Sequence, residues 1–257
     1  MPAIYTHYYF GQEIIEKLPL ELQDIIRKHP REYDFGTQGP DFFFYDRPFS
    51  KENLSSYGST YHCLPGYTFF KKAKEELAKY QDKEPLLAYI FGFLSHYVLD
   101  SLMHTYISNC GLSHAAIEAE YDSHLLRKDG IDPLHYNRSR IIKTTPLISD
   151  FIAKVFDIDL KSVRSMLNSF RYLSFAIDLP PTLVHFIMKK VGVYESFGQL
   201  TLTKNTDPQY DDSNRILDRI YQSAKELYQK MALKLMNFLQ DKEELDQDFD
   251  YNYENRR

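Results

Sequence analysis

Apolar residues recur at helical spacing along most of the chain, in runs that Pro and Gly separate. Side chains three or four positions apart share one face of a helix, so such runs indicate helices that bury one side. Alternating strand patterns joined by Gly-containing turns are hard to find. The pattern predicts an all-α fold, namely a single-domain multi-helix bundle. Its longest apolar stripe, within residues 213–240, comprises Ile216, Ile220, Ala224, Leu227, Met231, Leu235 and Phe238.

Pro, Ser and Gly residues mark several helix boundaries. Pro85 suits a first helical turn, where a backbone N–H has no intrahelical partner, and Ser113 suits an N-cap. Gly130 is typical of a residue that follows a helix. The connection at 108–113 is short enough for the helices on either side to pack antiparallel. We expect helices at 20–28, 67–80, 86–107, 114–128, 146–156, 160–173, 181–191 and 213–240.

The length and composition favour one core. A chain of 257 residues, 43% of them hydrophobic, can bury about three-quarters of its unfolded surface in a single domain. No internal repeat or linker divides it, so we expect one helical domain at 1–240. Residues 241–257 are polar and mostly acidic, a composition that predicts a disordered tail. Residues 31–64 contain several Gly and Pro and are expected to form a long, loop-rich stretch.

The charge and the apolar segments exclude several classes of protein. A net charge of −5 leaves no basic excess for coating duplex nucleic acid or for holding an anionic membrane. Residues 86–107 are apolar enough for a membrane span, but they carry His96, Asp100 and His104, so we expect a buried core helix and no transmembrane segment. The first residues lack a secretory signal, which predicts a cytoplasmic protein with Cys63 and Cys110 reduced.

Ligand-type side chains repeat at helical spacing in the most apolar part of the chain. His96, Asp100 and His104 fall at i, i+4 and i+8, and His114 and Glu118 repeat the i, i+4 spacing on the next predicted helix. Residues 84–126 contain no Lys or Arg, so a buried Asp100 has no cation nearby in the sequence. It must be protonated, paired with a distant Arg, or bound to a metal ion. Spacing alone leaves a metal site and a hydrogen-bonded polar cluster equally open.

Two further residues become informative only in combination with that set. Asp41 follows a Gly-Pro pair and precedes three Phe residues, and His62 lies in a Tyr-His-Cys sequence. Taken singly, Asp41 is more typical of a turn or helix cap and His62 of a partly buried, hydrogen-bonded histidine.

The complete set resembles a known family. The chain order His7, Gly-Pro-Asp41, His62, His96-x3-Asp100, His104, His114-x3-Glu118 is similar to that of the zinc-dependent phospholipase C family, which is related to the fungal single-strand zinc nucleases. The resemblance implies that one zinc lies among a first group, Asp41, His62, His96 and Asp100. It implies that a second zinc lies among His104, His114 and Glu118.

The same resemblance bears on a third zinc and on Asp41. In the family, a histidine near the N-terminus, here His7, and a mature N-terminal Trp complete the third site, toward which Asp100 would bridge. This sequence contains no Trp, so two or three zinc ions are expected. Asp41 is expected to act as a ligand or as the general base.

The resemblance implies a metal-dependent phosphoester hydrolase, in which a zinc-activated water attacks a phosphodiester. The expected substrate is a small phosphoester or a phospholipid. Two alternatives stay open: a nuclease or nucleotidase with the same zinc site, and a catalytically inactive metal-binding or interaction protein.

Overall fold

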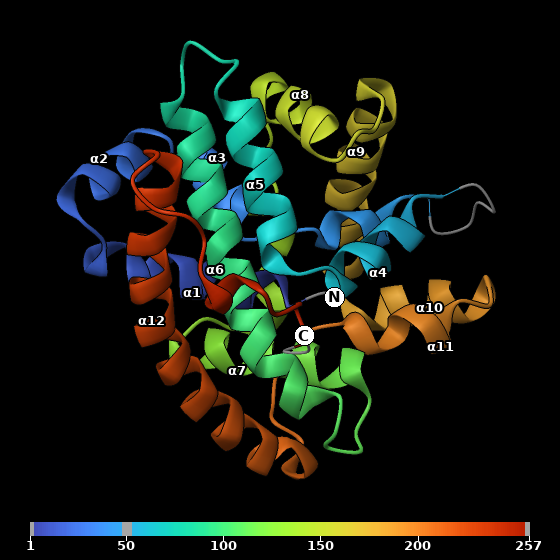
Figure 1. The fold of residues 1–257 in the computed structure, drawn as a ribbon. Coiled ribbons are helices and arrows are strands. Elements are labelled where there is room, and N and C mark those ends of the chain that lie inside the picture. Colours follow the sequence, from blue (N-terminus) through green and yellow to red (C-terminus); the bar gives the residue numbers. More distant parts are fainter. Residues whose placement is uncertain (1–2, 48–52, 255–257) are drawn as a thin grey trace.

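The structure is a computed structural model that describes residues 3–47 and 53–254. Every regular element in those two ranges is an α-helix or a short 3₁₀-helix, so the predicted all-α fold is confirmed (Figure 1). The α-helices are α1 (Ile4–Ile14), α2 (Leu20–Lys28), α3 (Pro30–Gly36), α4 (Ser55–Cys63), α5 (Gly66–Leu77), α6 (Glu84–Ile107), α7 (His114–Lys128), α8 (Pro146–Val155), α9 (Leu160–Ile177), α10 (Pro181–Lys190), α11 (Tyr194–Phe197) and α12 (Asp211–Leu239). The 3₁₀-helices are η1 (Ile15–Lys17), η2 (Asp41–Tyr45), η3 (Pro133–His135), η4 (Arg138–Arg140), η5 (Gly198–Leu200), η6 (Pro208–Tyr210) and η7 (Gln247–Phe249).

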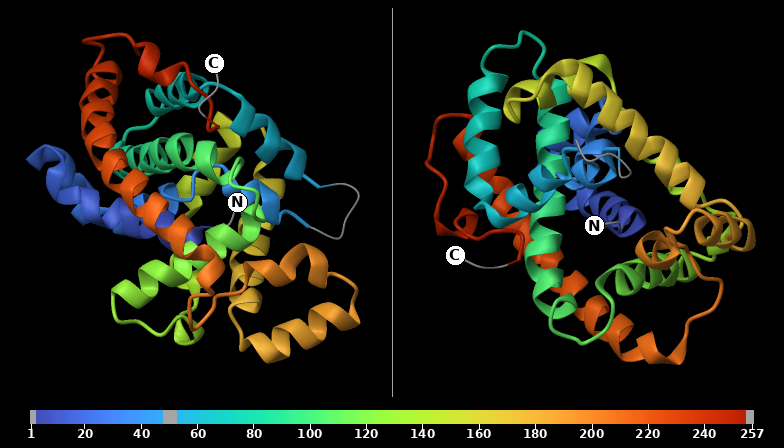
Figure 2. Two further views of the ribbon diagram at one scale, coloured as in Figure 1. Left: turned by 90° about the horizontal axis from the view of Figure 1, so that it is seen from below. Right: turned by 90° about the vertical axis from the view of Figure 1, so that its right-hand side faces the viewer.

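Helix α6 lies at the centre of the bundle, with α3, α12, α1, α2 and α5 packed around it (Figures 1 and 2). It is the one helix in the described part of the chain that is long and apolar enough to cross a membrane. The protein itself buries 89% of its most apolar window, as the core-helix prediction requires. Pro85 lies in its first turn.

Two glycines let α3 approach α6 closely. A Cβ on Gly36 would lie 2.3 Å from the carbonyl oxygen of Tyr89, and a Cβ on Gly92 would lie 2.3 Å from that of Tyr33. Any larger residue would therefore force the two helices apart. The close crossing places the segment after α3, which leads to Asp41, directly beside the middle of α6.

The C-terminal helix packs lengthwise on the bundle, as its apolar period predicts. Helix α12 lies along α6, where the Tyr228 hydroxyl donates to the carbonyl of Phe91 at 3.1 Å. The buried stripe is rotated from the predicted one: Leu217 and Tyr221 are buried, whereas Ile216 and Ile220 are only half-buried. Tyr side chains extend the apolar face here, since their rings are buried while their hydroxyls reach polar partners.

The loop-rich prediction for 31–64 is wrong for much of that range. Helix α3, η2 and α4 account for most of its described residues, and residues 48–52 lie outside the described part of the chain. The prediction failed because the Gly and Pro residues suggested loops, although the aromatic residues between them are packed in the core. Phe35, Phe42 and Phe43 are fully buried against one another and Phe156, so the segment contributes its own piece of the core.

The C-terminal segment is not a disordered tail over residues 241–254. Phe249 and Tyr253 are buried, and the Tyr97 hydroxyl donates to the carbonyl of Tyr251 at 2.7 Å. Figure 1 shows this segment crossing back over α6 toward the middle of the molecule. Its aromatic residues bury enough apolar surface to order an otherwise acidic segment, an effect that average composition does not reveal.

Helix α7 does not run back along α6 as an antiparallel partner. It leaves the end of α6 at a steep angle and packs on α1, η5 and α12 (Figure 1). Ser113 occupies the predicted N-cap position, but its hydroxyl bonds Gln199 instead of the first turn of α7. The Ser113 side chain therefore links the start of α7 to η5 by a hydrogen bond.

Candidate metal centre

One face of α6 carries three of the predicted ligands into the core. His96, Asp100 and His104 are all buried, with exposures of 0%, 3% and 5%. Their i, i+4 spacing brings His96 Nε2 to 3.0 Å and His104 Nε2 to 3.5 Å from the Asp100 carboxylate. The predicted shared face is therefore confirmed, and Asp100 lies between the two imidazoles.

The two oxygens of Asp100 face different partners. Oδ2 lies 3.0 Å from Nε2 of His96 and 3.6 Å from Nε2 of His62. Oδ1 lies 3.1 Å from Nε2 of His7 and 3.5 Å from Nε2 of His104. Every ion-pair partner of Asp100 among the described residues is a histidine, so no distant Arg neutralises it there.

Asp41 and His62 complete a first group of ligands with His96 and Asp100. Asp41 begins η2 and is buried, and its Oδ1 lies 3.1 Å from Nε2 of His62. One potential ligand atom from each of the four residues lies within 4.8 Å of all the others. We call this set, Asp41, His62, His96 and Asp100, the first cluster.

Backbone carbonyls orient two imidazoles of the first cluster. Nδ1 of His62 lies 2.7 Å from the carbonyl of Gly58, one turn earlier on α4, and Nδ1 of His96 lies 3.2 Å from the carbonyl of Thr37. A proton on Nδ1 satisfies each carbonyl and leaves Nε2, the atom that faces the cluster, as the nitrogen that binds a metal ion once it carries no proton. These carbonyls are part of the site, and sequence spacing did not reveal them.

A second cluster consists of His104, His114 and Glu118. Glu118 Oε1 lies 2.9 Å from Nε2 of His114 and 3.4 Å from Nε2 of His104. Ligand atoms of these three residues also lie within 4.8 Å of one another. His104 comes from the end of α6, and His114 and Glu118 come from the start of α7. The steep angle between the two helices therefore brings the three side chains together.

His7 reaches the site from α1, and a buried carboxylate anchors the start of that helix. Asp122 accepts hydrogen bonds from the backbone N–H of Tyr5 at 3.2 Å and of Thr6 at 2.8 Å. The first N–H groups of a helix lack intrahelical partners, so Asp122 stabilises the turn that carries His7. Asp122 is itself paired with Arg138 at 3.0 Å.

Neighbouring charged groups shift the pKa values of the residues in the two clusters. Burial raises the pKa of Asp100, but the imidazoles of His104 and His96 outweigh burial and hold this pKa well below its usual range. Burial likewise opposes ionisation of Glu118, yet nearby positive charge, which His104 and His114 supply in part, lowers its pKa to about 2. Burial lowers the pKa of His62, but Asp100 and Asp41 raise it to about 9. The carboxylates of Asp100 and Glu118 are therefore ionised at neutral pH.

The donor atoms fit a metal ion. Nε2 of His62, His96 and His104 and Oδ2 of Asp100 are buried without a hydrogen-bond partner, although they converge. A cavity of about 10 Å³ lies beside His7, Asp100, His104 and Glu118, and a site of that size holds about one water-sized sphere. Imidazole nitrogens and carboxylate oxygens are the N and O ligands that zinc takes in proteins. A cluster satisfied by hydrogen bonds alone would not leave these atoms unpartnered.

The second cluster opens to solvent. A cavity of about 310 Å³ is lined by residues of both clusters and by neighbours that include Phe44, Ser59, Cys63 and Glu254. His114 is the most exposed ligand, with 41% of its side chain accessible. Small molecules therefore reach the two clusters from the side formed by α4 and the start of α7.

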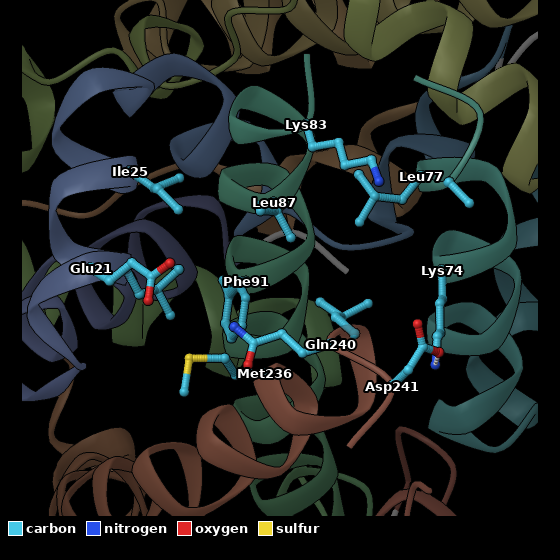
Figure 3. Close-up of a pocket in the computed structure, with 13 residues that line it drawn as sticks. Glu21, Ile25, Lys74, Leu77, Lys83, Leu87, Phe91, Met236, Gln240 and Asp241 are labelled. Atoms are coloured by element: carbon cyan, nitrogen blue, oxygen red, sulfur yellow. Dashed lines mark ion pairs between the residues drawn. The ribbon is translucent and has the colours of Figure 1, made fainter. Parts of the chain in front are cut away.

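Another cavity lies between α2, α5, α6 and α12 and contains none of the predicted ligands (Figure 3). It measures about 290 Å³, and its walls include Ile25, Leu87 and Phe91. At its edge Lys74 pairs with Asp241 at 2.6 Å. It is separate from the two metal-ligand clusters.

The comparison with known families agrees with this geometry. The model of the family described as zinc dependent phospholipase C matches residues 6–170, a segment that contains all the predicted ligands. The chain belongs to the zinc-dependent phospholipase C family. No curated protein and no solved structure matches the chain. The family and the buried ligand clusters together support a zinc phosphoesterase-like role for this member.

The remaining histidines have partners outside the two clusters. His29 lies near Glu84, His124 near Asp218, His135 near Asp132 and His185 near Thr201.

Tyr253 was missed by sequence reasoning. Its ring lies 5.0 Å from that of His62, and its backbone N–H donates to the His62 carbonyl at 3.2 Å. It lies in the stretch predicted to be disordered, so only the aromatic content of 249–253 could have indicated it. Tyr253 forms part of the wall over the first cluster.

Proposed function

We propose that this family member hydrolyses a phosphodiester with the help of two or three zinc ions. The observation that supports the proposal best is the position of Asp100. Its Oδ2 faces the first cluster, and its Oδ1 faces His7 and His104, which belongs to the second cluster. A carboxylate shared between adjacent ligand sets is typical of a multinuclear metal centre.

The chain contributes ligands, orientation and charge. When bound, zinc supplies positive charge to a phosphoester and lowers the pKa of a water ligand toward neutrality. The ionised Asp100 and Glu118 provide the negative charge that holds divalent cations. The carbonyls of Gly58 and Thr37 hold His62 and His96 with their Nε2 atoms toward the cluster, so these rings are oriented before any ion binds.

Among the residues that the structure describes, no Lys or Arg lines the opening of the metal centre. Residues 84–126, which carry His96, Asp100, His104, His114 and Glu118, contain no Lys or Arg. A phosphate that enters beside His114 would meet carboxylates that repel it. Cations held by the two clusters would offset this repulsion and attract an anionic substrate into the cavity.

Asp41 is proposed either to bind zinc or to accept a proton from the attacking water. Burial opposes its ionisation, but nearby positive charge, which the imidazoles of His96 and His62 supply in part, lowers its pKa, so it is a carboxylate at neutral pH. The variant Asp41→Asn separates the two roles. A ligand role predicts a lower zinc content, whereas a general-base role predicts an unchanged zinc content with a lower kcat.

The proposed substrate is a small phosphoester or a phospholipid, and hydrolysis of p-nitrophenyl phosphocholine tests it. We expect turnover that a chelator abolishes and added zinc restores. Release of mononucleotides from single-stranded DNA, without turnover of the choline ester, would favour the nuclease alternative. Bound zinc with neither activity would favour an inactive metal-binding protein.

A matched pair of histidine variants on α7 links the activity to the site. His114→Ala removes a ligand of the second cluster and is expected to abolish most of the turnover. His124→Ala removes a histidine of the same helix that pairs with Asp218 instead, and it should keep wild-type turnover. Equal activity of the two variants would refute the assignment of the second cluster.

A further inference from the structure

Helix α10 exposes an apolar face to solvent. Leu183, Phe186, Ile187 and Val191 have exposures of 47%, 64%, 47% and 62%. Their spacing places the four side chains on one side of the helix and its C-cap. The adjoining side packs on the protein, where Val184 is buried and His185 bonds Thr201. Single exposed apolar residues are common, but a continuous group of this kind indicates an interaction surface.

The end of α9 extends the apolar surface next to α10. Tyr172 is 71% exposed and Phe175 is 50% exposed. Between α9, α10 and α11 lies an open cavity of about 280 Å³ lined by apolar side chains, among them Leu173, Ile187 and Val191. We call this combination of α10, the last turns of α9 and the cavity between them the apolar arm.

The charges around the apolar arm are positive, in contrast with the rest of the chain. The exposed Arg171, Lys189 and Lys190 lie in or beside it. Between residues 160 and 194 the sequence contains one acid, Asp178, and this carboxylate is buried against Arg138 at 2.7 Å. The whole chain carries a net charge of −5, so the cationic character is local to this surface.

The apolar arm is attached beside the opening of the metal centre. Gln199 of η5, which follows α11, bonds Ser113, the residue before the ligand His114. Figures 1 and 2 show α10 and α11 extending from the same side of the molecule as α4, which contributes Ser59, His62 and Cys63 to the opening. A surface that bound the arm would therefore lie near the entrance to the clusters.

We propose that the apolar arm docks on a lipid surface that contains anionic headgroups. A helix with exposed aromatic and aliphatic side chains and flanking lysines suits the boundary between headgroups and acyl chains, where apolar groups are buried and cations meet lipid phosphates. The long Lys189 and Lys190 side chains reach the headgroups while Phe186 and Ile187 enter the apolar layer. A two-fold dimer through the apolar arm would bring Lys189 and Lys190 of both copies together, and the repulsion of these like charges favours an anionic lipid surface as the occupant.

Vesicle co-sedimentation of the full chain tests the docking. Vesicles of phosphatidylcholine with phosphatidylglycerol should bind the protein, vesicles of phosphatidylcholine alone should bind it more weakly, and salt should reduce the difference. The double variant Phe186→Ser and Ile187→Ser should lower the partition coefficient by about tenfold or more. The double variant Lys189→Glu and Lys190→Glu should weaken binding only to the anionic vesicles.

A matched control uses another exposed apolar residue. Leu20 on α2 is 75% exposed, and Leu20→Ser should leave vesicle binding unchanged. Because the altered side chains are exposed, all variants should keep the wild-type unfolding midpoint. The assay measures binding and not hydrolysis, so an inactive metal centre would not affect it.

Three results would overturn the proposal. The first is an absence of binding to anionic vesicles, and the second is equal loss of binding in the α10 variants and in Leu20→Ser. The third is a dimer in solution that the Phe186→Ser and Ile187→Ser changes dissociate, since the apolar arm would then join two copies of the chain.

Discussion

Gly39 is the position where a single methyl group should disturb the first cluster most selectively. Its φ is +50°, and a Cβ there would lie 2.1 Å from Cδ2, 2.3 Å from Cγ and 2.6 Å from Nε2 of His96. Carbon atoms in contact are normally about 3.5–4.0 Å apart, so the imidazole would have to move by about 1 Å or more. Zinc sites tolerate distance changes of only about 0.2 Å.

The cost of Gly39→Ala has two parts. A residue with a Cβ in the left-handed region costs about 1–2 kcal/mol, and overpacking a dense interior adds about 1–3 kcal/mol. Together they predict that the variant is destabilised by roughly 2–5 kcal/mol and binds less zinc. Chemical denaturation measures the first effect, and elemental analysis measures the second.

Gly130→Ala isolates the backbone part. Gly130 has a φ of +73°, and a Cβ there would meet nothing within 4 Å. This control should lose only about 1–2 kcal/mol and keep its zinc. If Gly39→Ala bound as much zinc as the wild type and was no less stable than Gly130→Ala, the reasoning about His96 would be refuted.

Three further predictions concern the frame of the site. Arg138→Met leaves Asp122 and Asp178 buried without their cation and should destabilise the protein by about 3–5 kcal/mol in denaturant unfolding; a loss below about 1 kcal/mol would contradict this. Tyr253→Ala should cost about 3 kcal/mol if the C-terminal segment is part of the core, whereas a disordered tail predicts a change within about 0.5 kcal/mol. Because the pKa of His62 is about 9 in the metal-free protein, zinc binding at pH 7 should release a proton, and affinity should rise with pH until that pKa is passed. Calorimetry in buffers of different ionisation enthalpy measures the release, and identical heats in all of them would contradict it.

Local patterns in the sequence predicted most of the longer helices and the spacing of the candidate ligands along them. Helix α2 has the predicted bounds, and Pro85 and Pro146 lie in the first turns of α6 and α8. The i, i+4 spacing brought Asp100 to His96 as expected, because a helix fixes that distance whatever surrounds it. Helix α1 was not predicted, since residues 4–14 mix aromatic and polar side chains without a clear stripe.

Local sequence patterns could not predict which residues from distant parts of the chain meet at the site. Asp122 lies one turn beyond Glu118, and nothing in its sequence position indicates that it is fully buried between the start of α1 and Arg138. The carbonyls of Gly58 and Thr37 carry no sequence signal, because any residue supplies a carbonyl. Tyr253 reaches the first cluster from more than a hundred residues away along the chain, where composition indicated disorder.

The zinc content of the purified protein tests the central claim most directly. Elemental analysis of the wild type should find two or three zinc ions per chain, and Asp100→Asn should show a marked loss, because one carboxylate faces both sets of ligands. A wild-type protein without zinc, or an Asp100→Asn variant with the full wild-type content, would contradict the account.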